Sequence, residues 1–364
     1  MRVKLEEVCK RIYAGGDVPK DRYSEMKTDK YSVPIYANAE KNDGLYGYTD
    51  KAREKELSIT VAARGTIGFT VIRREPFLPV IRLITVVPDT KKVSERYLYY
   101  VLKNCKPQFS GTSIPQLTVP DIKKNSLELY NTSEQIKIAD RLDKISKIIE
   151  LRKQELSALD NLIKARFVEM FGTGNYPIEK LGAVCKKITD GTHKTPTYLN
   201  EGITFISAKN IVNGELDFTD IKYISEIEYQ EIQKRCQTAI YDILLSKSGS
   251  LGSPVIVKTE KKLGLFESLA ILKYDRKKLV PEFLCEQLKT DRIQRQFTTG
   301  TKGVAIKHLH LGVIADTDII VPALDEQKEF ADFVHQVNKS KVKVQKALDE
   351  TQKLFDSLMQ QYFG

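Results

Sequence analysis

The sequence predicts an α+β fold in which two similar globular domains are separated by two long antiparallel coiled-coil helices, with a pseudo-twofold internal repeat. Three observations predict it. Segments of the first half return in the second half in the same order, short β-type runs alternate with turn residues in each globular part, and an apolar heptad pattern follows each of them. The 364 residues, 41% hydrophobic and 29% charged, have the composition of a folded chain with two or three domains, so intrinsic disorder is excluded.

The internal repeat rests on matches that keep their order along the chain. KLEEVCKRI at 4–12 returns as KLGAVCKKI at 180–188, ARGTIG at 63–68 as KSGSLG at 247–252, RYLYYVLKN at 96–104 as EFLCEQLKT at 282–290, and SEQIKIAD at 133–140 as DEQKEFAD at 325–332. Chance can produce one such match, but not a series in the same order. The second copy carries extra residues, which we expect to be spread through its globular part.

The periodicity gives the domain boundaries. We predict a first globular domain at 1–132, a central long helix at 133–172, a second globular domain at 173–324 and a C-terminal long helix at 325–364. Ser133 and Asp325 are the expected N-caps. A helix of about 40 residues spans roughly 60 Å, which is longer than a domain of this size needs for its own core. The two helices are therefore expected to bury their apolar stripes against each other, with the second returning along the first.

The composition also limits location and redox chemistry. No apolar run reaches the roughly 18 residues needed to cross a bilayer, and the first segment lacks the apolar core of a secretory signal. We expect a cytoplasmic protein without membrane contact. The five cysteines form no CxxC pair, so neither a disulfide framework nor a zinc site is indicated.

The net charge of +10 is not evenly distributed. The two predicted helices sum to zero, whereas the first globular domain carries +7 and the second +3. Two basic domains on a neutral rod suit an extended anionic ligand, and double-stranded DNA is the commonest ligand of this kind. Many basic proteins bind nothing acidic, so charge alone does not prove this partner.

Two glycine-containing loops are the first candidate DNA contacts. Glycine lets the backbone approach a phosphate closely, while a base and a hydroxyl supply donors. In the first loop the candidates are Arg64, Gly65 and Thr66, and in the second they are Lys247, Ser248 and Ser250. The alternative is a hairpin turn with a solvated base. The occurrence of the loop in both copies favours DNA contact.

Three further polar segments could reach DNA. Thr192, His193 and Lys194 lie in DGTHKTP among turn residues, although a lone loop histidine is more often simply solvated. The segments at 108–117 and 296–309 supply Thr112, Ser113, Gln116, Lys302 and Lys307. Gln116 could bind adenine with two hydrogen bonds in the major groove. The alternative for both segments is an ordinary polar loop. No second His or Cys stands at ligand spacing from His193, so we predict no metal site.

Catalytic signatures are absent from the sequence. There is no NPPY or DPPY for amino-methylation, no GxGxxG opening a βαβ unit and no GxxxxGK[ST] for ATP. The chain is therefore predicted to be non-catalytic and to bind no cofactor itself.

In its order of parts the chain resembles the specificity (S) subunits of type I restriction-modification systems. The local matches are DGTHKTPTY at 190–198, DILLSKSGSLG at 242–252 and VPALDEQ at 321–327, while the first copy has YAGGDVPKDRY and LELYNTSEQ instead. The resemblance implies two target-recognition domains that each recognise half of a bipartite DNA target, and helices that carry two methyltransferase (M) subunits. It also implies adenosylmethionine, ATP and Mg²⁺ on partner subunits, with motor-nuclease (R) subunits joining for restriction.

Two other functions fit parts of the sequence. The chain could be a coiled-coil tether whose domains bind proteins, or a stand-alone DNA-modifying enzyme, which the missing motifs disfavour. Binding of DNA that weakens with salt separates the first from a specificity subunit.

Overall fold

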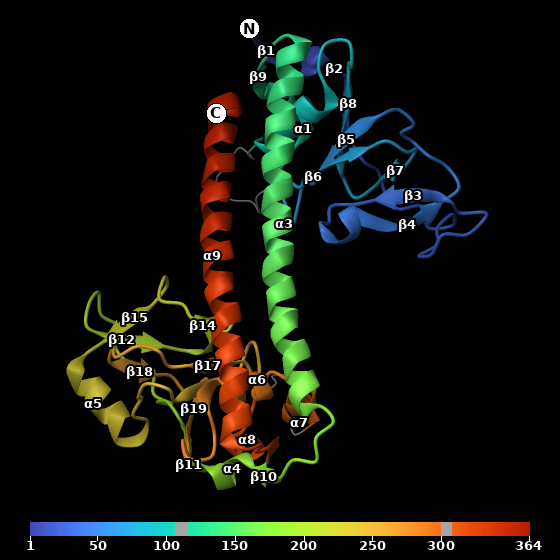
Figure 1. Cartoon of the computed structure of the whole chain (residues 1–364). Coiled ribbons are helices and arrows are strands. Elements are labelled where there is room, and N and C mark those ends of the chain that lie inside the picture. The colour runs from blue at the N-terminus through green and yellow to red at the C-terminus, as the bar shows by residue number, and fades with distance from the viewer. Residues whose placement is uncertain (106–115, 300–307) are drawn as a thin grey trace. The chain divides into compact units, whose positions relative to one another are not determined.

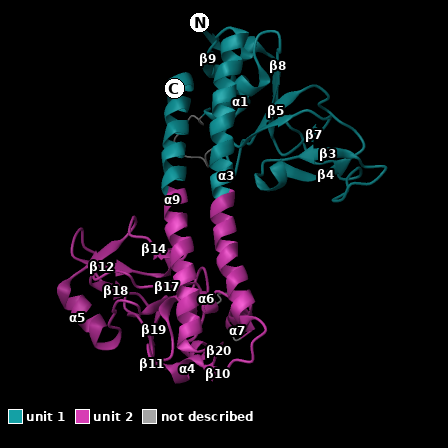
Figure 2. Cartoon of the chain, in the orientation of Figure 1, with its two compact units in different colours: residues 1–153, 346–364 teal, residues 154–345 magenta. Residues whose placement is uncertain are grey.

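The computed structural model describes residues 1–105, 116–299 and 308–364. The chain forms two compact units (Figure 2): unit 1 comprises residues 1–153 and 346–364, and unit 2 comprises residues 154–345. Two helices of 40 residues each, α3 (Thr132–Phe171) and α9 (Leu324–Phe363), contribute one part to each unit. We call residues 1–131 head 1 and residues 172–323 head 2. Each unit is thus one head with a segment of both long helices.

In its described residues, head 1 contains three small sheets and two short α-helices, besides two 3-10 helices at Leu5–Val8 and Lys41–Gly44 (Figure 1). Its elements are β1 (Arg2–Lys4), β2 (Cys9–Ala14), β3 (Val33–Tyr36), β4 (Leu45–Thr49), β5 (Ser58–Val61), β6 (Thr70–Arg73), β7 (Leu78–Pro79), β8 (Ile84–Pro88), α1 (Glu95–Lys103), α2 (Val119–Lys124) and β9 (Ser126–Glu128). The largest sheet has the antiparallel order β2-β8-β5-β6, beside the sheets β4-β3-β7 and β1-β9. The central strands β5 and β8 are buried along their whole length, which explains their continuous apolar and β-branched sequences.

Head 2 repeats this topology. Its elements are β10 (Ile178–Lys180), α4 (Leu181–Val184), β11 (Cys185–Asp190), β12 (Ile203–Ile206), β13 (Ile211–Val212), β14 (Glu215–Leu216), β15 (Lys222–Ile224), α5 (Glu226–Arg235), β16 (Ile243–Ser246), β17 (Pro254–Ile256), β18 (Leu263–Leu265), β19 (Leu269–Tyr274), α6 (Pro281–Leu288), α7 (Asp291–Thr299), α8 (Leu311–Ala315) and β20 (Asp318–Ile320). The sheet orders β11-β19-β16-β17, β15-β12-β18 and β10-β20 match those of head 1 one for one. The β13–β14 hairpin and α5 have no counterpart in the described part of head 1. The offset between the matched segments rises in several steps along the second copy, so the extra residues are not confined to these two elements.

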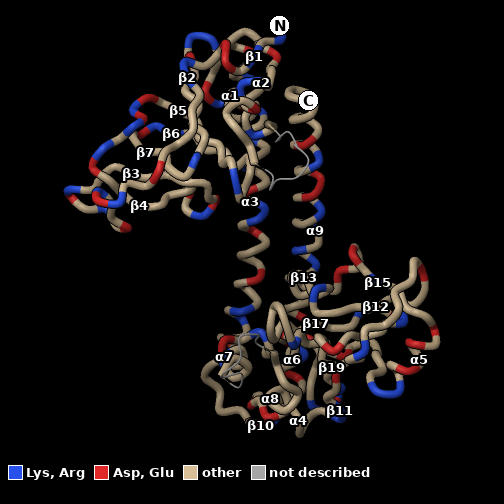
Figure 3. The backbone as a smooth tube through the Cα atoms, turned by 180° about the vertical axis from the view of Figure 1, so that it is seen from behind, with Lys and Arg blue, Asp and Glu red and all other residues tan. Residues whose placement is uncertain are grey.

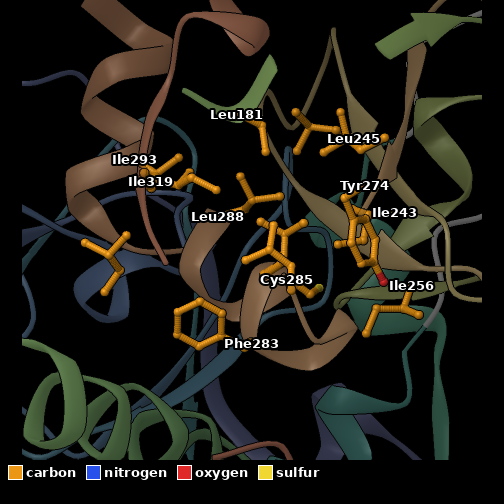
Figure 4. Close-up of a cluster of buried hydrophobic side chains, with 14 of the residues drawn as sticks. Leu181, Ile243, Leu245, Ile256, Tyr274, Phe283, Cys285, Leu288, Ile293 and Ile319 are labelled. Carbon is orange, nitrogen blue, oxygen red and sulfur yellow. The ribbon is translucent and has the colours of Figure 1, made fainter. Parts of the chain in front are cut away.

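The largest sheet of head 2 is buried on both faces. Ile243 and Leu245 of β16 pack into a cluster with Phe283 and Leu288 of α6 (Figure 4). Leu244, which points to the opposite face because side chains alternate along a strand, packs with Leu265 of β18 in a second cluster. The first cluster also contains residues of α3 and α9, so the core of head 2 continues into the helix pair.

Within each unit the two long helices run antiparallel. In unit 1, Arg141 of α3 donates to the Tyr362 hydroxyl at 3.0 Å, while Arg152 contacts Thr351. In unit 2, Lys341 of α9 pairs with Asp160 at 2.5 Å, while Arg166 pairs with Glu329 at 2.8 Å. In both units the partner number falls as the α3 number rises, which defines an antiparallel pair.

The caps of the long helices differ from the expectation. The Asn131 side chain accepts the backbone N–H of Glu134 at 2.9 Å, so Asn131 caps α3, and Ser133 lies inside the helix. At the start of α9 the Glu326 carboxylate accepts the Ala323 N–H at 3.2 Å, while Asp325 is likewise inside the helix. Both predicted caps lie two residues too late in the sequence. Asp325 was mistaken for a cap because an acid is also favoured in the first turn of a helix, where the helix dipole stabilises negative charge.

A buried glutamine fastens each long helix to its head. The Gln135 side chain accepts the Ser94 N–H at 2.8 Å and donates to the carbonyls of Tyr130 at 2.8 Å and Lys92 at 3.2 Å. Its counterpart makes the same three bonds in unit 2. The Gln327 amide accepts the Val280 N–H and donates to the carbonyls of Lys278 and Pro322, each at 2.9 Å. Ser94 and Val280 precede α1 and α6, so each glutamine joins the first turns of a long helix to the start of a head helix.

We predict that Gln327→Ala destabilises unit 2 by about 2–4 kcal/mol, because three backbone groups lose the partner that the buried Gln327 side chain provides. The measurement is urea-induced unfolding of the full chain. Gln336→Ala, which removes an exposed glutamine from the same helix, is the matched control and should change the free energy of unfolding by less than about 0.5 kcal/mol. Equal effects of the two substitutions would show that the glutamine contacts do not hold the helix to the head.

Candidate nucleic-acid interface

The two glycine-containing loops adopt the same backbone conformation. They join β5 to β6 and β16 to β17. Gly65 and Gly68 have φ of 70° and 84°, and Gly249 and Gly252 have φ of 71° and 74°. A Cβ atom at Gly249 would meet nothing within 4 Å, and one at Gly65 would meet only a carbonyl at 3.9 Å. Glycine is therefore favoured at Gly65 and Gly249 by backbone conformation alone, and the open space leaves the backbone accessible to a ligand.

The loops do not carry their basic residues at the same position. Leu117 donates its N–H to the carbonyl of Ala63 at 2.9 Å, and Leu309 donates to that of Lys247 at 2.8 Å. Lys247 is thus the structural counterpart of Ala63, and Ser248 is the counterpart of Arg64. The strand register thus agrees with the alignment of ARGTIG with KSGSLG, in which Arg64 and Lys247 occupy neighbouring rather than equivalent positions.

Lys247 is buried, not solvated. It is 3% exposed, and its ammonium lies 2.5 Å from the Asp190 carboxylate, which is itself buried. The ammonium would have to leave this pair to reach a phosphate. Because the paired residue is 57 positions away, nothing in the loop sequence itself indicates the burial. DNA contact by Lys247 stays a prediction, whereas its ion pair is a feature of the structure.

Asp190 is the centre of a charged network in head 2. Besides Lys247 it contacts Arg235, at the end of α5, and His193 Nε2 at 3.4 Å. His193 Nδ1 lies 2.8 Å from the Glu267 carboxylate in the β18–β19 turn. Burial alone would raise the pKa of Asp190, but the hydrogen bond and charge of Lys247, followed by the charges of Arg235 and His193, hold the pKa below its ordinary value. The network therefore ties the DGTHKTP segment to the KSGSLG loop.

Head 1 has alanines where head 2 has this ion pair. Ala14 ends β2 as Asp190 ends β11, opposite Ile84 and Ala270 respectively, and Ala63 occupies the position of Lys247. Both members of the buried pair are therefore replaced together. The common fold does not require the charges, which belong to head 2 alone.

In head 1 the structure brings Arg64 and Gln116 together. The Arg64 guanidinium donates to the Gln116 side-chain oxygen from Nε at 3.1 Å and from Nη2 at 2.8 Å. Asn38 also holds this loop, because its side-chain oxygen accepts the Ala63 N–H at 2.8 Å. Sequence reasoning missed Asn38, since an asparagine among turn residues gives no sign of a distant partner. It also missed Asp190, although this residue opens the DGTHKTPTY motif.

The remaining predicted residues fall into two groups. Thr66, Thr192, Lys194, Ser248 and Ser250 lie in the two glycine loops and the DGTHKTP segment, and Lys194 is exposed without an ion pair in the described part of the chain. Thr112, Ser113, Lys302 and Lys307 lie outside the described residues. Figure 3 shows Lys and Arg on the loops of both heads.

Within the described residues, no group of three or more His, Cys, Asp or Glu side chains is placed to hold a metal ion. A search of the same residues for a helix long and apolar enough to cross a membrane finds none.

Comparison with known proteins identifies the family. Residues 1–161 and 175–351 match the model of the type I restriction modification DNA specificity domain, and the chain belongs to this family. A putative type I specificity subunit of Mycoplasma pneumoniae is 34% identical over 164 residues, which are 42% of this chain and 45% of that protein. The chain spans about half the length of the first curated relatives it matches.

Two further proteins are similar over most of the chain. The EcoBI specificity subunit of Escherichia coli is 24% identical over 345 residues, covering 85% of this chain and 71% of that protein. The crystal structure of the S subunit of a type I restriction-modification system from M. genitalium has a TM-score of 0.53 at 16% identity, covering 100% of this chain and 96% of that chain. The similarity to this structure shows a shared fold.

We predict strong coupling between Asp190 and Lys247 in stability. Asp190→Ala should destabilise unit 2 by about 3–5 kcal/mol because it leaves a buried ammonium without its partner. The double variant Asp190→Ala/Lys247→Ala, which has the alanine pair of head 1, should be more stable than Asp190→Ala alone. A double-mutant cycle by urea unfolding measures the coupling. Lys262→Ala, which breaks an exposed pair with Glu226, is the control and should leave the midpoint nearly unchanged. Additive effects of the two substitutions in the pair would contradict the coupling.

The lowered pKa of Asp190 predicts an acid dependence of stability. A carboxyl with a folded-state pKa below its ordinary value of 3.8 stabilises the fold above that value, and the contribution is lost as the pH falls through the folded pKa. The free energy of unfolding of the wild-type chain minus that of the double alanine variant should therefore fall between about pH 6 and about pH 3. Urea midpoints of both chains at the two pH values measure this difference. A difference that rises in acid would contradict the sign.

Proposed function

We propose that this chain is the DNA sequence-specificity subunit of a type I restriction-modification complex, and that each head recognises one half of a bipartite double-stranded DNA target. The observation that carries the proposal is the repeated head: two domains of one topology present glycine turns of one geometry, in a chain that belongs to the DNA specificity family. The basic excess of both heads supports a polyanionic ligand.

We assign the DNA-facing surface of each head to the loops described above. In head 1 it contains Arg64, Gly65, Thr66 and Gln116. In head 2 it contains Thr192, His193, Lys194, Ser248 and Ser250, while Lys247 positions the glycine loop through Asp190. Because head 2 offers a hydroxyl where head 1 offers Arg64, the two heads should form different contacts and recognise different half-sites.

The long helices are proposed to form an antiparallel coiled coil with a pseudo-twofold axis and to carry two methyltransferase subunits. The antiparallel contacts inside each unit support this arrangement. α3 also leaves Ile148 and Leu151 exposed in unit 1, and Leu162 and Val168 exposed in unit 2. Exposed aliphatic side chains on a long helix suit a protein partner. The chain itself would be non-catalytic, with adenosylmethionine, ATP and Mg²⁺ on the methyltransferase and motor-nuclease subunits.

The test of the proposal is DNA binding by the full chain assembled with its methyltransferase subunits. The complex should bind duplex containing its methylated site with an affinity that falls steeply with salt, because phosphate contacts release counterions. Affinity without sequence preference would contradict specificity, and absence of salt-dependent binding would favour the protein tether.

We predict that replacing residues 1–132 by the first recognition domain of another family member changes only one half of the methylated sequence. The hydrophobic clusters described for head 2 contain no residue of head 1, so the two recognition energies should be nearly additive. Sequencing of modified adenines in cells measures both half-sites. A change in both would overturn the assignment of one half-site to each head.

A further inference from the structure

A two-residue turn in head 1 has a conformation that its side chains disfavour. Ile81 and Arg82, between β7 and β8, have φ of 51° and 60°, both in the left-handed region. A β-branched residue at positive φ is an outlier, and each non-glycine residue there is strained. The chain uses Asn213–Gly214, with φ of 52° and 78°, for the turn of the β13–β14 hairpin. Asn and Gly are the residues expected at such a turn.

The strain is specific to head 1. Ile81 donates its N–H to the carbonyl of Gly16 at 2.8 Å, and Glu267 makes the equivalent bond to Thr192 at 2.9 Å in head 2. The counterpart turn is therefore Glu267–Ser268, and neither of its residues has a positive φ. The fold shared by the two heads can thus form this turn without strain.

The strained turn is held against the proposed DNA-facing surface. The Ile81 carbonyl accepts a hydrogen bond from the Asn38 side-chain nitrogen, and the Asn38 side-chain oxygen accepts the N–H of Ala63, the residue before Arg64. One asparagine therefore fixes the position of the turn relative to the glycine loop. A conformation fixed on both sides can persist in spite of its strain.

The turn presents chemistry that suits DNA. Ile81 is 45% exposed, and Arg82 is exposed with no hydrogen bond, ion pair or ring contact in the described part of the chain. A further guanidinium, that of Arg53, lies 3.9 Å from the Cβ position of Gly16, whose carbonyl accepts the Ile81 N–H. Arg53 also lies over the Tyr13 ring, 4.6 Å from its centroid, and Arg64 donates to Gln116. Within the described residues, Arg82 is therefore the one of these three arginines whose guanidinium is left for a polyanion.

We propose that the Ile81–Arg82 turn is a DNA contact of head 1 that the glycine loop alone does not provide. Arg82 binds a phosphate or the edge of a guanine, and Ile81 packs against the adjoining sugar or base. The inference rests on the proposed function, since it assigns a further segment to the same DNA-facing surface. An Asn–Gly pair would relieve the strain, but it would supply neither the aliphatic side chain of Ile81 nor the guanidinium of Arg82. The strained pair is therefore retained.

The test is the variant Ile81→Asn/Arg82→Gly in the full chain with its methyltransferase subunits. Relief of two strained residues should raise the midpoint of thermal unfolding by about 2–8 °C. The affinity for duplex carrying the mapped site should fall at least about fivefold. Greater stability with weaker binding is the expected result, because a turn with a purely structural role would not lose binding when it is stabilised. Unchanged affinity, or a midpoint that falls, would overturn the inference.

The variant Arg82→Gln distinguishes a phosphate contact of Arg82 from a contact with a base, and it leaves Ile81 unchanged. A phosphate contact predicts a salt slope reduced by about 1, and a base contact predicts an unchanged slope with relaxed preference at one position of one half-site. Either result supports the proposal, and wild-type affinity, slope and half-site together contradict it. Asn213→Ile/Gly214→Arg, the reverse exchange, is the stability control and should lower the midpoint.

The outcome is distinguishable from failure of the proposed function. If the wild-type complex does not recognise a specific duplex, the proposed function fails before either variant is compared. If the wild-type complex recognises its site and both variants bind it equally well, only the role of the Ile81–Arg82 turn is wrong.

Discussion

The apolar stripe along two forty-residue helices is the constraint on which the rest of the structure depends. Neither helix can cover this stripe with its own residues, so each half of it is buried in a unit, beside a head and a segment of the other helix. In unit 2, Phe167 of α3 stacks on Phe283 of head 2 and meets Phe330 of α9 edge to face. Helix, head and partner helix thus share one core, and the position of each depends on the other two.

Much of this architecture could be predicted from local patterns in the sequence. The repeat, the alternation of β-type runs with turns and the heptads depend on spacing along the chain, which a sequence displays directly. The contacts of polar residues within the apolar stripe could not be predicted: Arg152 contacts Thr351, and Lys341 pairs with Asp160. The partners lie more than 180 residues apart, and only the folded chain brings them together.

The candidate site was predictable only where its chemistry is local. The glycine turns could be predicted because a left-handed backbone conformation favours glycine, which is visible in the sequence. The environment of Lys247 could not, since its partner Asp190 lies on another strand, 57 positions away in the sequence. The strained pair Ile81–Arg82 could not be predicted either, because Ile and Arg rarely adopt a positive φ and are not expected in such a turn.

The two heads differ at the end of their equivalent strands. Head 2 has a buried ion pair between Asp190 and Lys247, whereas head 1 has alanine at both equivalent positions. A buried ion pair contributes little net stability because desolvation offsets most of the attraction, but it fixes orientation. Here it fixes the loop that carries Ser248 relative to the segment that carries His193. In head 1, Asn38 holds the loop that carries Arg64, because its side-chain oxygen accepts the Ala63 N–H.

The glutamines that anchor the long helices bear on how heads can be exchanged between chains during evolution. All six hydrogen bonds of Gln135 and Gln327 go to backbone atoms, which every sequence possesses. These six hydrogen bonds therefore do not depend on which side chains the head carries at the bonded residues. A gene could therefore acquire a foreign head by recombination near this joint and keep these six hydrogen bonds, provided that the new head also supplies an apolar side chain where Phe283 packs on α3 and α9.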